Sequence, residues 1–459
     1  MRDCLLEHRP HNAVPLVPVT EKNLGAWLEA QPDAVRRWLE SAGFAAKTGS
    51  FCLVPADNRG LAMVVVGVGS ADDPWALGGM PSVLPKGCYY LDADWEARQQ
   101  ERAALGWALG AYQFTRYKEA RALGAELAVT LESRLGGVRQ QAQAIALVRD
   151  LINTPAEDMM PEHLFDAAVA LGHEFSATVR QTVGDELLQR NFPVIHAVGR
   201  ASVHAPRLID LGWGDVRAPR VTLVGKGVCF DSGGLDLKNA NNMRLMKKDM
   251  GGAAHALGLA RLVMGEQLPV RLRVLIPAVE NAVSGNAFRP GDVIRSRKGL
   301  TIEIDNTDAE GRLILCDALT EAVSENPDLV IDFSTLTGAA RVALGADVPA
   351  MFCNHDDVAA GLLACAEEER DPLWRLPLHR PYREMLDSRV ADIANASAAP
   401  YGGAITAALF LQEFIPNHTP WTHFDLMGWN TRSRPGRPEG GEAMGLRAVF
   451  RYLRQRYAA

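Results

Sequence analysis

Short apolar runs and helical apolar patterns alternate through most of this 459-residue chain, and this alternation limits the fold more than any other feature. The runs predict strands at 221–225, 270–278, 329–333, 350–353 and 422–426. Apolar residues spaced three and four apart predict helices at 251–264, 311–324, 356–369 and 403–415. Such alternation predicts an α/β domain with a central mixed sheet flanked by helices.

The chain before this region predicts a second, smaller domain. Residues 61–68 (LAMVVVGV) indicate a buried strand, and residues 96–112 have the apolar spacing of a helix. An amphipathic helix at 137–152 is followed by NTPAEDMMP, whose Pro, Asn and Asp residues are typical of a loop. We expect a smaller N-terminal α/β domain at 1–135, a linking helix and loop at 136–155, and a larger α/β domain at 156–459.

Composition excludes several classes of protein. Apolar residues make up 47% and charged residues 22% of the chain, which is typical of a globular enzyme. The net charge of -7 disfavours nucleic acid as a partner. Seven cysteines without a CxxC pair disfavour a disulfide framework and favour a reducing, cytoplasmic location. The charged start MRDCLLEHRP and the lack of a long uncharged apolar run disfavour export and membrane insertion.

Three segments of the larger domain carry most of the reactive side chains. They are VGKGVCFDSGGLDLK (224–238), MKKDMGGAA (246–254) and NTDAEGR (306–312). Glycines in the first segment allow the backbone to turn sharply and approach a ligand. Asp249 in the second precedes two glycines at a helix start, where the helix dipole favours a carboxylate. Asp308 and Glu310 are two residues apart, so in an extended segment both would point the same way.

These acidic groups indicate a site for divalent cations. Carboxylates that converge on one pocket repel one another unless cations neutralise them. Hard oxygen ligands without an HExxH motif suit Mg²⁺, Mn²⁺ or Zn²⁺, so the residues alone leave the metal open. Taken singly, each segment also has a structural interpretation, as a helix cap, a turn or a buried ion pair.

Other functions compete with this interpretation. Ser232 suggests a serine hydrolase, but its segment is not GxSxG. The glycines around Lys226 lack the GxxxxGK[ST] order of a phosphate loop, and GVGSADD lacks the third glycine of a dinucleotide loop. A two-metal phosphoesterase is the stronger enzymatic alternative. From another class, the chain could be a DNA-binding or structural scaffold with an incidental metal site, which the acidic net charge disfavours.

The three segments together resemble the leucine aminopeptidase, or cytosol aminopeptidase, family. NTDAEGRLILCDAL (306–319) is similar to the family signature almost letter for letter, and the other two segments resemble its remaining metal-site motifs in the same order. The similarity extends over about residues 147–450, and the family's amino-terminal domain is variable. The resemblance implies a metal-dependent exopeptidase that removes N-terminal residues, with leucyl-type preference, from peptides with a free N-terminus. It also implies a homohexamer.

The resemblance further implies a role for each site residue. Two divalent ions, Zn²⁺ or Mn²⁺, would be held by Lys226, Asp231, Asp249, Asp308 and Glu310. Asp231 and Glu310 would bridge the ions and activate a water, and Lys226 would bind as a neutral amine. Lys238 and Arg312 would be the catalytic residues: Lys238 polarises the scissile carbonyl, and Arg312 holds a bicarbonate that relays a proton.

The resemblance also implies a substrate pocket, and one residue near it differs from the family pattern. The implied substrate-binding residues are Met246, Thr335, Leu336 and Gly338, which suit a leucine or methionine side chain, although Met246 also suits ordinary core packing. Lys248 occupies a position where the family more often has an uncharged residue. We expect Lys248 to perturb the neighbouring carboxylate of Asp249.

Overall fold

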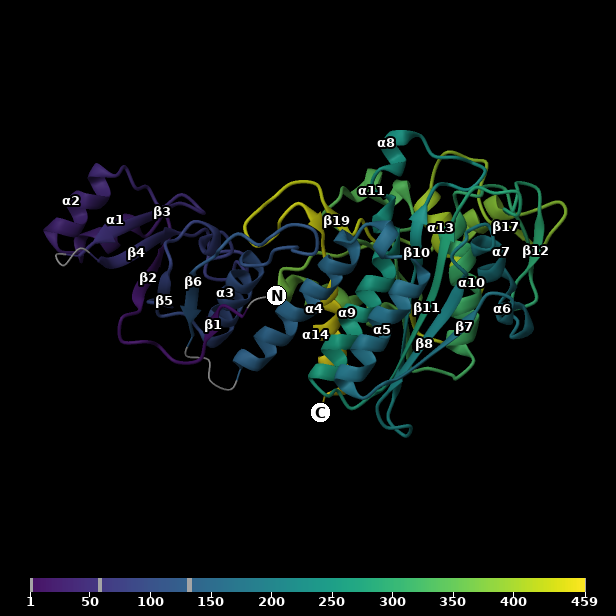
Figure 1. Cartoon of the computed structure of the whole chain (residues 1–459), viewed down its shortest axis with the longest axis horizontal. Coiled ribbons are helices and arrows are strands. Elements are labelled where there is room, and N and C mark those ends of the chain that lie inside the picture. The colour runs from purple at the N-terminus through teal and green to yellow at the C-terminus, as the bar shows by residue number, and fades with distance from the viewer. Residues whose placement is uncertain (1–2, 57–59, 130–133, 459) are drawn as a thin grey trace. The chain divides into compact units, whose positions relative to one another are not determined.

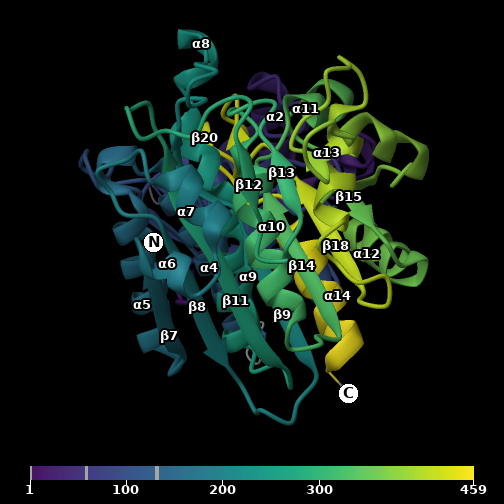
Figure 2. The same cartoon turned by 90° about the vertical axis from the view of Figure 1, so that its right-hand side faces the viewer.

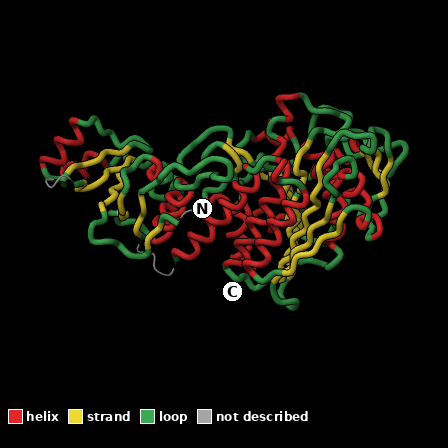
Figure 3. Tube along the Cα trace, viewed as in Figure 1, coloured by secondary structure: helices red, strands yellow, loops and turns green. Residues whose placement is uncertain are grey.

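The computed structural model describes residues 3–56, 60–129 and 134–458, which form two compact units (Figures 1 and 3). The first unit comprises Met1–Ala146 with Arg432–Glu439, and the second comprises Leu147–Thr431 with Gly440–Ala459. The start of MRDCLLEHRP and residues 130–133 of the predicted first domain lie outside the described residues. The domain limits expected from the sequence stay a prediction.

The first unit is built on a six-stranded sheet with the order β1-β6-β5-β2-β4-β3. Its strands are β1 (Leu5–Leu6), β2 (Val14–Val19), β3 (Phe51–Pro55), β4 (Leu61–Gly67), β5 (Gly87–Leu91) and β6 (Ala125–Ala128). All neighbours pair in parallel except β3, which runs antiparallel to β4. The parallel strands require crossover connections, which contain α1 (Leu24–Glu29), α2 (Asp33–Ser41) and α3 (Ala97–Gly110).

The second unit contains a nine-stranded mixed sheet. The order is β16-β15-β18-β14-β9-β11-β8-β7, and β10 also pairs with β11. The strands are β7 (Thr178–Val183), β8 (Arg207–Trp213), β9 (Arg220–Gly225), β10 (Gly227–Asp231), β11 (Arg271–Asn281), β14 (Leu329–Ser334), β15 (Ala350–Cys353), β16 (Trp374–Arg375) and β18 (Trp421–Asp425). The strands β18, β14, β9, β10 and β11 run parallel to one another, so their carboxyl ends lie at one edge.

Helices cover both faces of this second sheet (Figures 1 and 2). On one face α9 (Gly251–Gly265) packs against β9 and β14, and α5 (Pro161–Phe175) and α14 (Leu446–Tyr457) pack against α9. On the other face α10 (Glu310–Val323) packs against β9 and β11 and contacts α7 (Pro193–Gly199) and α13 (Gly403–Gln412). Burial on both faces explains why the parallel strands are continuous apolar runs.

Smaller elements surround this three-layer core. A three-stranded sheet has the order β12-β13-β17 (Val293–Arg295, Thr301–Glu303 and Ile393–Ala394), and β19 (Trp429–Asn430) pairs with β20 (Gly440–Gly441). The remaining α-helices are α4 (Leu135–Asn153), α6 (Glu186–Gln189), α8 (Ala240–Met243), α11 (Gly338–Leu344) and α12 (Asp356–Glu369). Within the described ranges, no helix has the length and apolar character needed to span a bilayer.

The predicted α/β class and the mixed sheet flanked by helices are confirmed. Strand β15 and helix α12 have the bounds predicted from the sequence, and the other predicted strands of the second unit differ by one to three residues at an end. One local prediction is wrong. Asp308 and Glu310 do not lie in an extended segment, because Asp308 is in a turn and Glu310 is the first residue of α10.

Candidate metal-binding active site

The carboxyl ends of the parallel strands deliver the first side chains of the site. Lys226 lies between β9 and β10, and Asp231 is the last residue of β10. Thr335 follows β14 directly. Side chains at such strand ends can meet in a crevice outside the sheet, where they do not have to fill the core.

Helix starts deliver the other carboxylates. Asp249 lies in the short 3-10 helix η3 (Met246–Met250), just before α9, and Glu310 begins α10. Glycine permits the close approach of α9 to the sheet: a Cβ atom at Gly252 would lie 2.1 Å from the carbonyl oxygen of Phe333. The positive end of each helix dipole favours the carboxylate beside it.

Asp231, Asp308 and Glu310 form a compact acidic cluster. One carboxylate oxygen from each lies within 4.8 Å of the others. Asp231 and Glu310 are buried, whereas Asp308 is partly exposed. A turn followed by a helix therefore brings Asp308 and Glu310 together, although we expected an extended segment to do so.

Two lysines form ion pairs with these carboxylates. The Lys226 ammonium lies 2.7 Å from Asp249 Oδ2 and 2.8 Å from Glu310 Oε1. The Lys238 ammonium lies 2.9 Å from Asp231 Oδ2 and also contacts Asp308 Oδ1. Thus the five predicted ligands and the predicted catalytic lysine are linked through ion pairs and the carboxylate cluster.

Burial and neighbouring charges shift the pKa values of the carboxylates. Burial raises the pKa of Glu310 to about 8, and the negative charge of Asp231 adds to this rise. Burial and Asp231 also raise the pKa of Asp308 to about 6. At Asp249 burial raises the pKa, but the charges of Lys226 and Lys248 outweigh it and the net pKa lies below the usual range. Lys248 perturbs Asp249, as the sequence predicted.

The lysine pKa values are shifted upward by the same carboxylates. Burial alone would lower the pKa of Lys226, but Asp249 and Glu310 outweigh it, and the net pKa is well above the ordinary value. The pKa of Lys238 is raised in the same way by Asp231 and Asp308. Positive charge is therefore strongly favoured at both ends of the cluster.

Two side chains hold these carboxylates in place: Asn281, which the sequence did not indicate, and Thr335, which it placed in the substrate pocket. Asn281, at the end of β11, donates from Nδ2 to Asp231 Oδ1 at 2.9 Å and to the carbonyl oxygen of Thr307 at 3.1 Å. The hydroxyl of Thr335 donates to Asp249 Oδ1 at 2.7 Å. Asn281 could not be found from sequence, because its role depends on the pairing of β10 with β11.

Arg312 is a buried cation of the same site. Its Nη1 donates to the carbonyl oxygen of Asn395 at 2.8 Å, and its buried Nε has no hydrogen-bond acceptor among the described residues. Burial lowers the pKa of Arg312 to about 10, and Glu310 opposes this lowering. The guanidinium therefore remains charged at neutral pH and can bind an anion.

All eleven residues predicted for the site line one cavity of about 570 Å³ in the second unit. The predicted substrate-binding residues Met246, Thr335, Leu336 and Gly338 form part of its wall. Met246 is 9% exposed and therefore belongs to both the core and the cavity surface. The role of each residue stays a prediction.

Two further cations line this cavity. Lys248 is buried in η3 and Arg341 is half-buried in α11. Burial lowers the pKa of Lys248 to about 8; Asp249 opposes this lowering, and the positive charge of Arg341 adds to it. The cavity wall thus has a positive region beside the carboxylate cluster.

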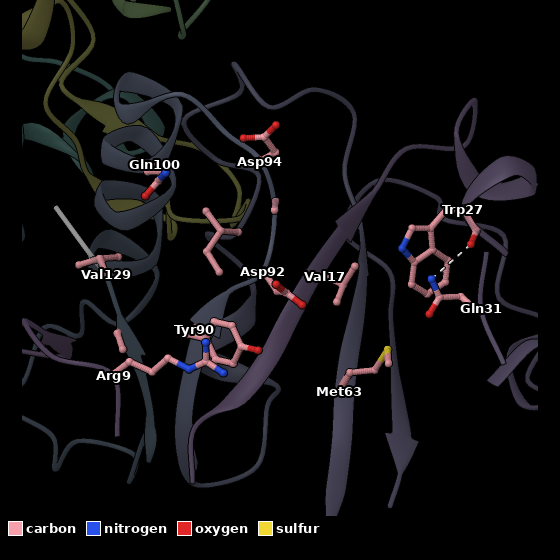
Figure 4. Close-up of a pocket in the computed structure, with 13 residues that line it drawn as sticks. Arg9, Val17, Trp27, Gln31, Met63, Tyr90, Asp92, Asp94, Gln100 and Val129 are labelled. Atoms are coloured by element: carbon pink, nitrogen blue, oxygen red, sulfur yellow. Dashed lines mark hydrogen bonds between the residues drawn. The ribbon is translucent and has the colours of Figure 1, made fainter. Parts of the chain in front are cut away.

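Two other places do not contain comparable chemistry. The Ser232 hydroxyl donates to the Asn281 carbonyl oxygen at 2.7 Å, and no histidine of the described chain is bonded to it, which argues against a serine hydrolase. The first unit has a cavity of about 550 Å³ (Figure 4) where the Arg9 guanidinium lies 3.2 Å from the centre of the Tyr90 ring. Its lining residues include two carboxylates, but no histidine, cysteine or lysine.

The donor set of the second-unit cavity fits divalent cations. Glu310 Oε2 is buried and has no hydrogen-bond donor among the described residues, which would be costly without a cation. The three clustered carboxylates and Asp249 supply hard oxygen ligands, and Lys226 can add a nitrogen once it loses its proton. The fold and this cavity define a metal-dependent hydrolase.

Comparison with known proteins makes this assignment specific. The model of the cytosol aminopeptidase family catalytic domain matches residues 146–450, and that of the M17 aminopeptidase N-terminal domain matches residues 14–130. The chain belongs to the cytosol aminopeptidase family and is a metal-dependent aminopeptidase that hydrolyses N-terminal residues. The phosphoesterase and scaffold alternatives are not favoured.

Individual relatives agree with the family. A probable cytosol aminopeptidase of Syntrophotalea carbinolica is 43% identical over 321 residues, which cover 69% of this chain and 64% of that protein. The crystal structure of cytosol aminopeptidase from Coxiella burnetii is 51% identical with a TM-score of 0.96, covering 99% of both chains. The bottromycin maturation enzyme BotP in complex with Mn is 34% identical with a TM-score of 0.88, covering 96% of this chain and 99% of that one.

Proposed function

We propose that this protein is a leucyl-type aminopeptidase with a two-metal site. Lys226, Asp231, Asp249 and Glu310 would hold the tighter ion, and Asp231, Asp308 and Glu310 the more exchangeable one. The supporting observation is that these residues converge on one cavity with orphaned carboxylate oxygens. When bound, the two ions supply an activated water and an anchor for the free α-amine of the substrate.

Lys238 is the residue that polarises the scissile carbonyl. Its ammonium is held by Asp231 and Asp308, which keep it charged and leave it at the cavity wall. A fixed ammonium stabilises the oxyanion that develops during attack on the carbonyl. Arg312 would bind bicarbonate through its unpaired edge, and this anion would carry the proton toward the leaving amine.

The pocket beside this machinery sets the position of the N-terminal side chain. Met246 and Leu336 give it an apolar wall, and Gly338 leaves room beside them. This wall would accept leucine or methionine side chains. An internal peptide bond has no free amine to anchor, so we expect exopeptidase action rather than endopeptidase action.

Metal identity and assembly belong to the same proposal. Both Zn²⁺ and Mn²⁺ accept carboxylate and amine ligands, and the related BotP structure is a complex with Mn. By family resemblance we further propose a homohexamer in the cytoplasm that acts on peptides and binds neither nucleic acid nor membrane. The domain division at 1–135, 136–155 and 156–459 is proposed on the same ground.

The experiment compares leucine p-nitroanilide with its N-acetyl derivative after chelation and addition of Mn²⁺ or Zn²⁺. We expect hydrolysis of the first substrate alone. Asp308→Asn or Glu310→Gln should lower kcat/KM at least about 100-fold, because each removes a ligand charge. Asp305→Asn is the matched control, since Asp305 is exposed and outside the cavity. Equal turnover of both substrates would contradict amine anchoring.

A further inference from the structure

The cavity has two cations that the proposed mechanism does not use. Lys248 is 2% exposed and Arg341 is half-buried, and both side chains line the cavity. Among the residues that the structure describes, neither side chain has an ion pair or a hydrogen bond. A buried ammonium without a partner is costly, so this arrangement indicates that a ligand supplies the missing anion.

The neighbouring carboxylates are already engaged elsewhere. Asp249 pairs with Lys226 and accepts a hydrogen bond from Thr335. Asp425 accepts hydrogen bonds from the backbone N–H groups of Leu336 and Thr337 and from the Thr337 hydroxyl. Neither carboxylate comes within ion-pair distance of Lys248, so the positive charge of the wall remains available to a ligand.

The two cations come from the elements that form the predicted side-chain pocket. Lys248 lies two residues after Met246 in η3, and Arg341 lies three residues after Gly338 in α11. A side chain that packs its methylene groups on Met246 and Leu336 would therefore meet positive charge beside the apolar wall. Such a side chain is apolar along its length and anionic at its end.

We propose that Lys248 and Arg341 bind the side-chain carboxylate of an acidic N-terminal residue, so that the enzyme prefers N-terminal glutamate over glutamine. This inference rests on the proposed aminopeptidase function and adds a specificity determinant to it. Charge-assisted bonds from an ammonium and a guanidinium recognise a carboxylate and discriminate against a neutral amide of the same shape.

Bicarbonate has the same carboxylate chemistry and is the other source of an anion. If it were the ligand of Lys248, the effect of removing Lys248 would be shared by every substrate. If the substrate side chain is the ligand, the effect is confined to acidic N-terminal residues. The two sources therefore differ in substrate dependence, which kinetics measures directly.

The test measures kcat/KM for the α-p-nitroanilides of glutamate, glutamine and leucine with the Mn²⁺-loaded, full-length enzyme at one pH and one bicarbonate concentration. We expect a glutamate-to-glutamine ratio of about ten or more in the wild type, the usual effect of a hydrogen bond to a charged group. Lys248→Met should bring this ratio close to one, mainly through KM for glutamate. Arg341→Met should lower it as a second, independent variant.

Lys247→Met is the matched control. Its ammonium donates to the Asn153 carbonyl oxygen at 2.6 Å and lies over the Trp429 ring, and Lys247 does not line the cavity. This variant removes the same charge one residue away, and the glutamate-to-glutamine ratio should stay at the wild-type value. A general loss of activity or of folded protein lowers kcat/KM for both substrates together and leaves the glutamate-to-glutamine ratio unchanged. A change in this ratio within one variant therefore reports recognition of the carboxylate.

Three outcomes would overturn the inference. A wild-type ratio near one would show no recognition of the carboxylate, and a ratio that survives both Lys248→Met and Arg341→Met would place recognition elsewhere. An equal loss for all three substrates that depends on bicarbonate concentration would identify bicarbonate as the ligand. Failure of the metal-loaded wild type to hydrolyse any of the three would instead refute the proposed function itself.

Discussion

Acid should destabilise this protein through one buried imidazole, that of His255 in α9. Its Nδ1 lies 2.6 Å from the carbonyl oxygen of Gly251, and its Nε2 lies 2.9 Å from the backbone nitrogen of Met444. The Met444 N–H can only donate, so Nε2 must accept and Nδ1 must carry the hydrogen. The neutral ring therefore satisfies both contacts, whereas a proton on Nε2 would face the Met444 N–H.

The size and sign of the effect follow from the pKa of His255. Burial lowers this pKa to about 4 from its ordinary value of 6.5. Between these two values the unfolded chain binds a proton that the folded protein does not, so stability is present above pH 6.5 and is lost as the pH falls toward 4. The shift corresponds to about 3 kcal/mol in total, of which about 2 kcal/mol is lost between pH 7.5 and pH 5.

The assay is urea unfolding of the chelated protein, followed by tryptophan fluorescence at pH 7.5 and pH 5. His255→Gln is the comparison, because an amide can donate to Gly251 and accept from Met444 without titrating. Other groups titrate equally in both proteins, so the wild type should lose about 2 kcal/mol more than the variant. Equal losses in the two proteins would refute the argument.

Two further substitutions test the packing that positions the site. Gly252→Ala places a methyl group 2.1 Å from the Phe333 carbonyl oxygen, so α9 must move. This shift should lower kcat/KM for leucine p-nitroanilide about 100-fold. Gly285→Ala is the control, because its methyl group meets nothing within 4 Å and should not change kcat/KM. Glu442→Gln removes the charge that pairs with Arg149 at 3.0 Å in the core. Urea unfolding should show that the free energy of unfolding falls by about 3 to 5 kcal/mol, because the Arg149 charge stays buried without its partner. A variant in which apolar side chains replace both residues should recover much of this loss.

The strands and helices of the second unit were largely predictable from sequence, because burial on both faces makes each parallel strand an uninterrupted apolar run. The four apolar residues of β15 illustrate this, since all are buried. In the first unit the strand predicted at 61–68 and the helix predicted at 96–112 match β4 and α3 within two residues, but the other strands were not predicted. Strand β1 has two residues and β6 has four, and runs this short carry no readable period. Its six-stranded sheet depends on pairings between distant segments.

At the site, prediction from the sequence failed for a different reason. Local order around Asp308 was predicted wrongly, because the Asn306 side chain accepts a hydrogen bond from the Asp308 N–H at 2.7 Å and closes a turn. The carboxylates could nevertheless be identified from the sequence, because they lie in short segments that also contain glycines. Asn281 and Arg341 carry no local signal, and their proximity to the cluster depends on strand register and on the docking of α11.

The charge of the cavity connects the proposed metal site with the proposed specificity. Two divalent ions would neutralise the four carboxylates, and the proton on Lys226 would be displaced when its nitrogen binds an ion. Lys238, Arg312, Lys248 and Arg341 would then line the cavity with little negative charge left among its residues. A cavity in this state attracts anions, because its walls exclude much of the water that would screen the charge. The preference for glutamate should therefore depend on the loaded metal site, and free glutamate should protect the Mn²⁺-bound protein against thermal unfolding more than glutamine does. Equal protection by the two amino acids would show that metal binding does not create the positive potential that this reasoning requires.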